Sequence, residues 1–275
     1  MEPQAVQVSP ALLDVRGLAK KYGDFTAVTD LTLQVRPGEV FVLLGPNGAG
    51  KTTTIRMLMG ILQPTAGSAS IGGLDCFADR SEVMRSVGYL PDEPIFYDFL
   101  RGRELVHFVG QMHGLDRRRT QQRAGALVER LDLADAMEEY AVNYSRGMKK
   151  KLALICAMLH EPRLLMMDEP TNGLDPQTTR TLHGIIRSHA AGGGSVLLST
   201  HLLDQAERLC TRVGILHKGR LAACGPLDDL RARASAGGSL EEIFFAVTSP
   251  DAPASDSPAP DAPAAASPAA EDSRQ

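Results

Sequence analysis

The sequence predicts an α/β fold built on a mostly parallel β-sheet. Three short apolar runs, at residues 40–44, 164–167 and 195–199, are bounded by glycine, proline or charge, as buried parallel strands are. Helical patterns lie between these runs, and strands that alternate with helices form a sheet covered on both faces. A chain of 275 residues is long enough for one large domain of this kind or two small ones.

The first run leads through a glycine-rich turn into a helix expected over residues 52–62. The turn reads Gly45-Pro-Asn-Gly-Ala-Gly-Lys-Thr52, which is the phosphate-binding pattern of a glycine, four residues, Gly-Lys and Ser or Thr. Its glycines let backbone N–H groups surround a phosphate, and the helix N-terminus adds partial positive charge. Lys51 would reach the β- and γ-phosphates and Thr52 would bind Mg²⁺. The alternative is a turn that binds nothing.

Residues 103–160 interrupt the alternation of strands and helices. They hold helical patterns at 104–113, 117–131 and 147–159 without a convincing strand, and Pro162 limits the last one. This stretch therefore predicts a helical insertion. Its two basic runs, at 117–119 and 149–151, are interpreted as solvated helix faces.

The run at 164–167 ends in two acids, Asp168 and Glu169. A buried strand that ends in a charge needs a partner for it, and Mg²⁺ bound through Asp168 would supply one. Glu169 faces the other way and would orient or deprotonate a water for attack on the γ-phosphate. Alone, the pair would be a surface turn, but the phosphate loop favours the metal site. A further helix, over 176–190, begins with Asp175 as its N-cap and ends at the glycines 192–194.

With these elements in place, residues 11–248 resemble the ATP-binding subunit of an ATP-binding-cassette (ABC) transporter, of the two-component exporter type. Residues 144–148 (Tyr-Ser-Arg-Gly-Met) resemble the family's signature loop and residues 172–175 (Asn-Gly-Leu-Asp) its D-loop. His201 stands where the family has its switch histidine, and Tyr22 where it has the aromatic that stacks on adenine. The resemblance implies a P-loop NTPase (RecA-like) core at about 11–91 and 161–230, an antiparallel β portion near the N-terminus, a helical subdomain at about 92–160 and an extension at 231–248.

The resemblance also implies an ATPase whose cofactors are ATP and Mg²⁺. It assigns ATP binding to Tyr22, Gly45, Pro46, Asn47, Gly48, Ala49, Gly50, Lys51, Thr52, Thr53, Ser145 and Gly147. It assigns catalysis to Glu169, His201 and Asp92, and the metal to Thr52, Asp168 and Asp92. Two such subunits, identical or different, would pair head to tail, so that Ser145 and Gly147 reach the ATP of the opposite subunit. A separate polytopic permease, met at the inner face of the membrane, would be the partner in export.

Three residues depart from the family pattern. Asp92 replaces the usual glutamine, Arg146 a glycine and Tyr144 a leucine, and Asp92 would alter the coupling between the γ-phosphate and the permease. Close to Asp92 lies an aromatic cluster, Phe96, Tyr97 and Phe99. It is either a satellite core beneath the helical insertion or part of an apolar groove for a short permease helix.

Charge and composition exclude other classes of protein. The chain has 29 basic and 33 acidic residues. Residues 249–275 hold one of the basic and five of the acidic residues, so residues 1–248 carry 28 of each sign. A neutral body argues against nucleic acid as a partner, although an ABC ATPase that acts on nucleic acid or ribosomes stays the alternative function. The four distant cysteines indicate reduced thiols, and we expect neither a secretory signal nor a membrane span. The tail at 249–275 is expected to be disordered, with a partner-docking peptide as the alternative.

Overall fold

The computed structural model describes residues 11–233 and 239–249. The tail predicted at 249–275 lies outside the described residues except for Ser249.

A six-stranded sheet forms the centre of the molecule. Its order is β10 (Arg220–Pro226), β9 (Arg212–His217), β3 (Val40–Leu44), β8 (Ser195–Thr200), β7 (Leu164–Asp168) and β6 (Val87–Leu90). All neighbours are parallel except the edge pair β9 and β10. The predicted α/β fold is therefore confirmed, and each of the three strands expected from the apolar runs is present.

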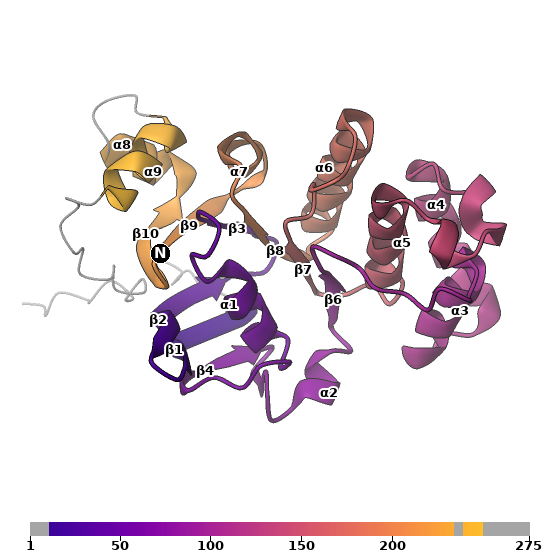
Figure 1. The fold of residues 1–275 in the computed structure, drawn as a ribbon, viewed down its shortest axis with the longest axis horizontal. Coiled ribbons are helices and arrows are strands. Elements are labelled where there is room, and N and C mark those ends of the chain that lie inside the picture. Colours follow the sequence, from indigo (N-terminus) through magenta and orange to yellow (C-terminus); the bar gives the residue numbers. More distant parts are fainter. Residues whose placement is uncertain (1–10, 234–238, 250–275) are drawn as a thin grey trace, which may run out of the picture.

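Both faces of this sheet are buried, which explains why its strands are continuously apolar. Phe41 and Leu43 pack on the side of α1 (Lys51–Leu58), whereas Val42 and Leu44 pack with the helices of the other side. These other helices are α5 (Arg146–Met158), α6 (Pro176–Ala191) and α7 (Leu203–Leu209) (Figure 1). A parallel strand between two helical layers has no solvent face on which to place polar side chains.

The ends of two helices follow local rules. Helix α6 begins as predicted, because the Asp175 carboxylate accepts a hydrogen bond of 2.8 Å from the Thr178 N–H and Pro176 occupies the first turn. Helix α1 ends at Leu58, four residues before the predicted end at 62. Gly60 has φ +61°, a left-handed conformation that glycine adopts readily and that terminates a helix.

A second, antiparallel sheet covers the outer side of α1. Its order is β2 (Phe25–Val35), β1 (Leu13–Tyr22), β4 (Ala66–Ile71) and β5 (Leu74–Asp75). Helix α1 contacts strands of both sheets, and the short α2 (Arg80–Val83) returns the chain to β6. The first strands after residue 11 thus form the antiparallel portion that the family resemblance implies.

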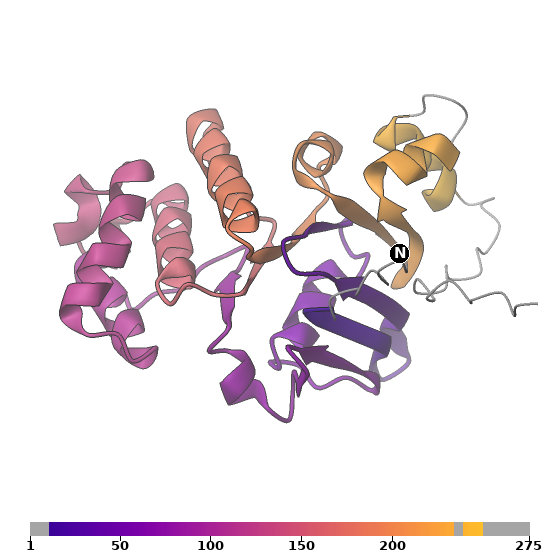
Figure 2. The same ribbon diagram turned by 180° about the vertical axis from the view of Figure 1, so that it is seen from behind.

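Helices that have no strand between them gather at one end of the molecule. They are α3 (Gly102–Met112), α4 (Arg117–Arg130) and α5, and two short 3-10 helices, Asp135–Glu138 and Ala141–Asn143, connect α4 to α5. Figures 1 and 2 show them at the end of the sheet opposite to α8 (Leu227–Arg233) and α9 (Leu240–Thr248). The three predicted helices are present, each within two residues of its expected start.

One expectation for these helices is wrong. Residues 117–119 are exposed, as a solvated helix face should be, but the run at 149–151 is not uniformly solvated. The Lys150 side chain is only 1% exposed. Consecutive residues of a helix point about 100° apart, so the packing of each helix decides whether a run of three basic residues stays exposed, as at 117–119, or directs one side chain toward the body of the protein, as with Lys150.

Candidate functional site

The predicted site residues meet because four parallel strands end at the same edge of the sheet. Leu44 of β3 is paired with Thr200 of β8, and Asp168 of β7 with Ser199 of β8. The loops that follow these strands therefore carry their side chains to one place. This is the edge at which open α/β sheets bind ligands.

The phosphate loop between β3 and α1 has glycine at three positions where backbone conformation or close neighbours disfavour a side chain. Gly48 and Gly50 have φ of +80° and +105°, which L-residues rarely adopt. A Cβ at Gly50 would lie 2.6 Å from the Ala27 carbonyl oxygen, and one at Gly45 would overlap the Leu216 carbonyl. The loop is thus held against its neighbours at Gly45 and Gly50, while Gly48 has no atom within 4 Å of the place where its Cβ would be.

A cavity of about 380 Å³ lies in front of this loop. Its lining consists of Phe25, Ala27, Asn47, Gly48, Gly50, Lys51, Thr52, Thr53, Asp92, Glu169, Asn172 and His201. Residues from the phosphate loop, the strand ends and the D-loop therefore surround one space. Phe25 and Ala27 were not predicted; they belong to β2, and their contribution depends on how the antiparallel sheet packs beside the loop.

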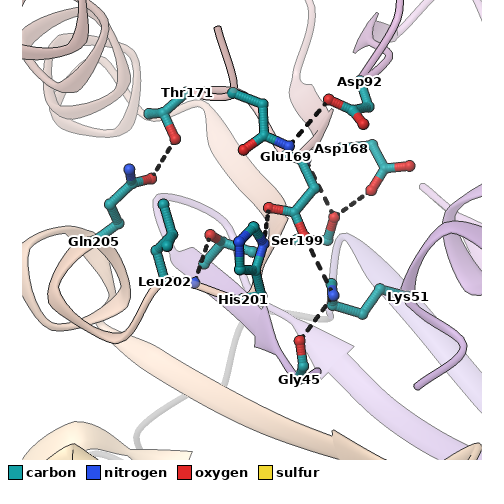
Figure 3. A network of polar contacts seen from close by, with 12 residues as sticks. Gly45, Lys51, Asp92, Asp168, Glu169, Thr171, Ser199, His201, Leu202 and Gln205 are labelled. Carbon is teal, nitrogen blue, oxygen red and sulfur yellow. Dashed lines mark hydrogen bonds and ion pairs between the residues drawn. The ribbon is translucent and has the colours of Figure 1, made fainter. Parts of the chain in front are cut away.

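Lys51 and Glu169 are charge partners inside this site (Figure 3). The Lys51 ammonium donates to the carbonyls of Gly45 at 2.8 Å and Pro46 at 3.2 Å, and it lies 3.2 Å from Glu169 Oε1. The two side chains are 6% and 9% exposed. Charge attraction is strong where water is excluded, so this contact holds the two side chains against each other.

Glu169 is also held by its backbone and by His201. Its φ of +43° is unusual for an L-residue, and its N–H donates to the Ser199 carbonyl at 3.1 Å. His201 Nδ1 lies 3.0 Å from Glu169 Oε2 and donates to it in the tautomer that suits a carboxylate. Glu169 therefore reaches over the cavity with one carboxylate oxygen toward lysine and the other toward histidine (Figure 3).

Asp168 points away from Glu169, as expected for successive residues at a strand end. It is 2% exposed, and its Oδ1 atom accepts a hydrogen bond from the Ser199 hydroxyl. Within the described part of the chain, no basic side chain forms an ion pair with it. A buried carboxylate that has only a hydroxyl partner suits a cation.

Asp92, in the loop after β6, contacts three nitrogen donors through Oδ1. They are Asn172 Nδ2 at 3.2 Å, Lys150 Nζ at 3.3 Å and Arg146 Nη2 at 3.6 Å. Lys150 was not predicted as part of the site. Burial lowers the pKa of its ammonium, and the charge of Asp92 opposes this.

The signature loop lies at the N-terminus of α5. Ser145 is the exposed N-cap and accepts a hydrogen bond of 3.2 Å from the Met148 N–H. Among the described residues, those lining the cavity do not include Ser145 or Gly147. Tyr144 is 5% exposed, and its hydroxyl donates to the Ala136 carbonyl at 2.6 Å. The departure from leucine at this position is thus a packing feature of the helical region.

Two aromatic residues stand at the hairpin between β1 and β2, and one of them, Phe25, lines the cavity. Tyr22 and Phe25 are paired across the hairpin between β1 and β2. Phe25 lines the cavity and is 65% exposed, while the Tyr22 ring lies 5.3 Å from Lys20 Nζ. The hairpin therefore offers a second candidate for the aromatic surface that the sequence assigned to Tyr22.

For residues 11–233 and 239–249, none of the helices combines the length and apolar character that crossing a bilayer requires.

A parallel sheet with a glycine-rich phosphate loop, facing a buried aspartate and a glutamate at neighbouring strand ends, defines a P-loop nucleotide hydrolase. Comparison with known proteins specifies it further. Residues 28–172 match the family model described as "ABC transporter". The chain belongs to the ATP-binding subunits of ABC transporters, which are ATPases. The resemblance seen in the sequence is thereby confirmed.

Individual relatives agree with this assignment. "Daunorubicin resistance ATP-binding protein DrrA3" of Streptomyces coeruleorubidus is 39% identical over 80% of this chain and 70% of its own length. "Bacitracin transport ATP-binding protein BcrA" of Bacillus licheniformis is 35% identical over 81% and 72%. A solved ATP-binding subunit of an ABC transporter is 35% identical, has a TM-score of 0.82, and is matched over 86% of this chain and 99% of that one.

Proposed function

We propose that this ATPase powers export through a separate polytopic membrane permease, to which it binds at the inner face of the cell membrane. Two of the similar proteins are named for antibiotic resistance or transport. The observation that carries the proposal is the cavity in which the phosphate loop, Glu169 and His201 face one another. ATP hydrolysis at this cavity would supply the energy for export.

In this proposal Glu169 is the general base. Its carboxylate lies in the cavity between Lys51 and His201, so a water in front of the γ-phosphate would find an acceptor within reach. Lys51 would exchange its present carbonyl partners for the phosphates, and His201 would hold either Glu169 or the γ-phosphate. Asp92, at the wall of the same cavity, would sense the occupied state and alter the coupling to the permease.

The residues also fit Mg²⁺. Asp168 is a buried carboxylate with a hydroxyl as its hydrogen-bond partner, and Thr52 is exposed in the cavity lining. These two side chains would hold the cation, which would neutralise phosphate charge when bound. Asp92 is the remaining oxygen donor at the cavity wall, although its Oδ1 atom already faces Lys150 and Asn172.

Nucleotide contacts would come from two subunits. Residues 45–53 surround the phosphates of the subunit's own ATP, and Tyr22 or Phe25 stacks on the adenine. Ser145 and Gly147 lie outside the cavity lining, at the positive N-terminus of the 13-residue helix α5, which suits the γ-phosphate of a partner's ATP. This supports a head-to-tail dimer, of one chain or of two different chains.

An exposed apolar surface is proposed for the permease. Ile95, Tyr97 and Phe99 are 92%, 56% and 72% exposed, and the Tyr97 ring contacts the rings of Phe99 and Phe108. Phe96 instead packs against the core. Phe96 thus fits the interpretation of the aromatic cluster as a satellite core, whereas the exposed Tyr97 and Phe99 fit the interpretation as a surface for the permease. These exposed side chains suit an amphipathic permease helix.

The same arrangement supports the proposed domain division. Residues 92–160 would move as a helical subdomain against the core at 11–91 and 161–230, with α9 in the extension at 231–248. Such a movement would displace the permease surface when the two subunits close around ATP.

Two experiments test the proposal. Glu169→Gln should retain ATP binding and lower kcat by about 10²–10⁴-fold, because the amide cannot accept the proton. The matched control is Glu82→Gln, since Glu82 is 56% exposed and pairs with Arg85 away from the cavity. Wild-type turnover in Glu169→Gln would refute the base assignment. Affinity purification of the full chain from membranes should recover a polytopic protein, and recovery of ribosomes or nucleic acid instead would refute transport.

A further inference from the structure

We propose that Lys150 is a positioning residue that connects the signature-bearing helix α5 to Glu169. The inference rests on the proposed role of Glu169 as the base. Lys150 is one of the largest fully buried side chains, in a helix where neighbouring Lys149 is 28% exposed. A lysine is rarely buried unless its charge has partners, so its surroundings need explanation.

The Lys150 ammonium has an acceptor for each of its three protons. It donates to the Glu169 carbonyl at 2.7 Å and the Asn172 carbonyl at 3.1 Å, and it lies 3.3 Å from Asp92 Oδ1. An ammonium has three N–H donors and no acceptor, so this environment matches its chemistry. One side chain of α5 thereby joins the loop after β6, the residue after β7 and the D-loop.

The bond to the Glu169 carbonyl acts where the backbone is strained. Glu169 has φ +43°, a conformation that persists only when its surroundings fix it. The Glu169 N–H is held from one side by Ser199, and its carbonyl is held from the other side by Lys150. With both ends of the residue fixed, its carboxylate stays between Lys51 and His201.

Lys150 also lies on the same helix as the signature loop residue Ser145, close to it along the helix axis. Ser145 is the N-cap of α5 and Lys150 follows it by five residues, which corresponds to about 7.5 Å along a helix. A displacement of Ser145 by a bound phosphate would therefore move the Lys150 stem with the same rigid helix. The contact with Glu169 would pass this displacement to the base within one subunit.

The position explains why an acid stands at Asp92, where the family usually has glutamine. A buried ammonium that faces only carbonyl groups would lack a counter-charge, and desolvation would oppose its ionised form. Asp92 supplies that charge at 3.3 Å, which glutamine could not. The two residues are therefore interpreted as a matched pair.

The test is steady-state ATPase activity of the full chain with Mg²⁺ and ATP, comparing wild type, Lys150→Met and Lys149→Met. We expect Lys150→Met to lower kcat by about 10–100-fold and to leave KM for ATP within about two-fold, because small displacements of a catalytic group are costly. Lys149 lies on the same helix, and the contact found for it is with Asp98 at 3.7 Å. Lys149→Met should keep both constants.

Three results would overturn the inference. They are a Lys150→Met kcat within about two-fold of wild type, a raised KM with unchanged kcat, or an equal loss of kcat in Lys149→Met. If Lys150→Met fails to fold, Lys150→Gln is measured in its place. The expectation is the same: a lowered kcat with an unchanged KM for ATP. Glu169→Gln in the same assay separates the two proposals. Turnover retained in Glu169→Gln refutes both, whereas its loss together with an active Lys150→Met refutes only the role of Lys150.

Discussion

Tyr144 and Gly102 pack so closely that the change in stability caused by substituting one should depend on which residue stands at the other position. Tyr144→Leu restores the residue usual in the family's signature loop. It removes the 2.6 Å hydrogen bond to Ala136, and it leaves a space in the region that the tyrosine ring, in a side chain only 5% exposed, now fills. The lost bond is worth about 1 kcal/mol and the lost packing about 1–3 kcal/mol. We expect stability to fall by about 2–4 kcal/mol, or roughly 4–16 °C in Tm.

Gly102→Ala should cost less stability in the Tyr144→Leu background than in the wild type. In the wild type the new Cβ would overlap the Tyr144 hydroxyl and lie 3.2 Å from its Cζ, so we expect a loss of about 1–3 kcal/mol. In Tyr144→Leu the hydroxyl and the ring are removed and Met137 Cα remains at 3.3 Å, so alanine should cost about 1–2 kcal/mol less than it does in the wild type.

Urea denaturation of the four proteins measures this coupling in a double-mutant cycle. The control is Gly125→Ala in helix α4, where a Cβ would meet nothing within 4 Å, so it should stabilise both backgrounds equally. Additive effects of Tyr144→Leu and Gly102→Ala, within about 0.5 kcal/mol, would refute the steric argument.

Two further predictions concern pH and the nucleotide. Burial and the neighbouring His113 ring lower the pKa of His160 from 6.5 to about 4. As the pH falls, this histidine is therefore protonated in the unfolded chain before it is protonated in the folded protein. The contribution of neutral His160 to the free energy of unfolding should be complete above pH 6.5 and should be lost as the pH falls toward 4. Thermal melting between these values should show a shallower pH dependence in His160→Gln, and equal slopes would contradict the assignment. Phe25→Ala should raise KM for ATP about 3–10-fold with kcat unchanged, and more than Tyr22→Ala does, because Phe25 lines the cavity; the reverse order in the same ATPase assay would restore Tyr22 as the stacking residue.

The central sheet was predictable from the sequence because burial on both faces makes its strands continuously apolar. Periodicity did not predict the antiparallel sheet. Strands β1 and β2 have register shifts after Val15 and Leu18, and Gly17 has φ +57°, so the alternation of inward and outward side chains is broken. A pattern with a period of two loses its phase at such a bulge. Only the family resemblance indicated these strands.

The site shows the same division. The phosphate loop and the two acids after β7 are contiguous in sequence, so a local pattern identified them. The roles of Phe25 and Lys150 depend on contacts between segments far apart in the chain, since Lys150 meets a loop 58 residues earlier. No local pattern distinguishes a solvated lysine from a buried one in a basic run. Only the packing of α5 decides which of three lysines faces inward.

The residues that depart from the family pattern are not equivalent, although two of them touch. Arg146 lies 3.6 Å from Asp92 and 3.4 Å from Glu93, but the three side chains are 53%, 36% and 77% exposed. Exposed ion pairs contribute about 0–1 kcal/mol, so Arg146 adds little to stability. Lys150 meets the same Asp92 while buried, where removing one partner leaves the other uncompensated. Asp92 is therefore explained by its contact with the buried Lys150 rather than by its contact with the exposed Arg146.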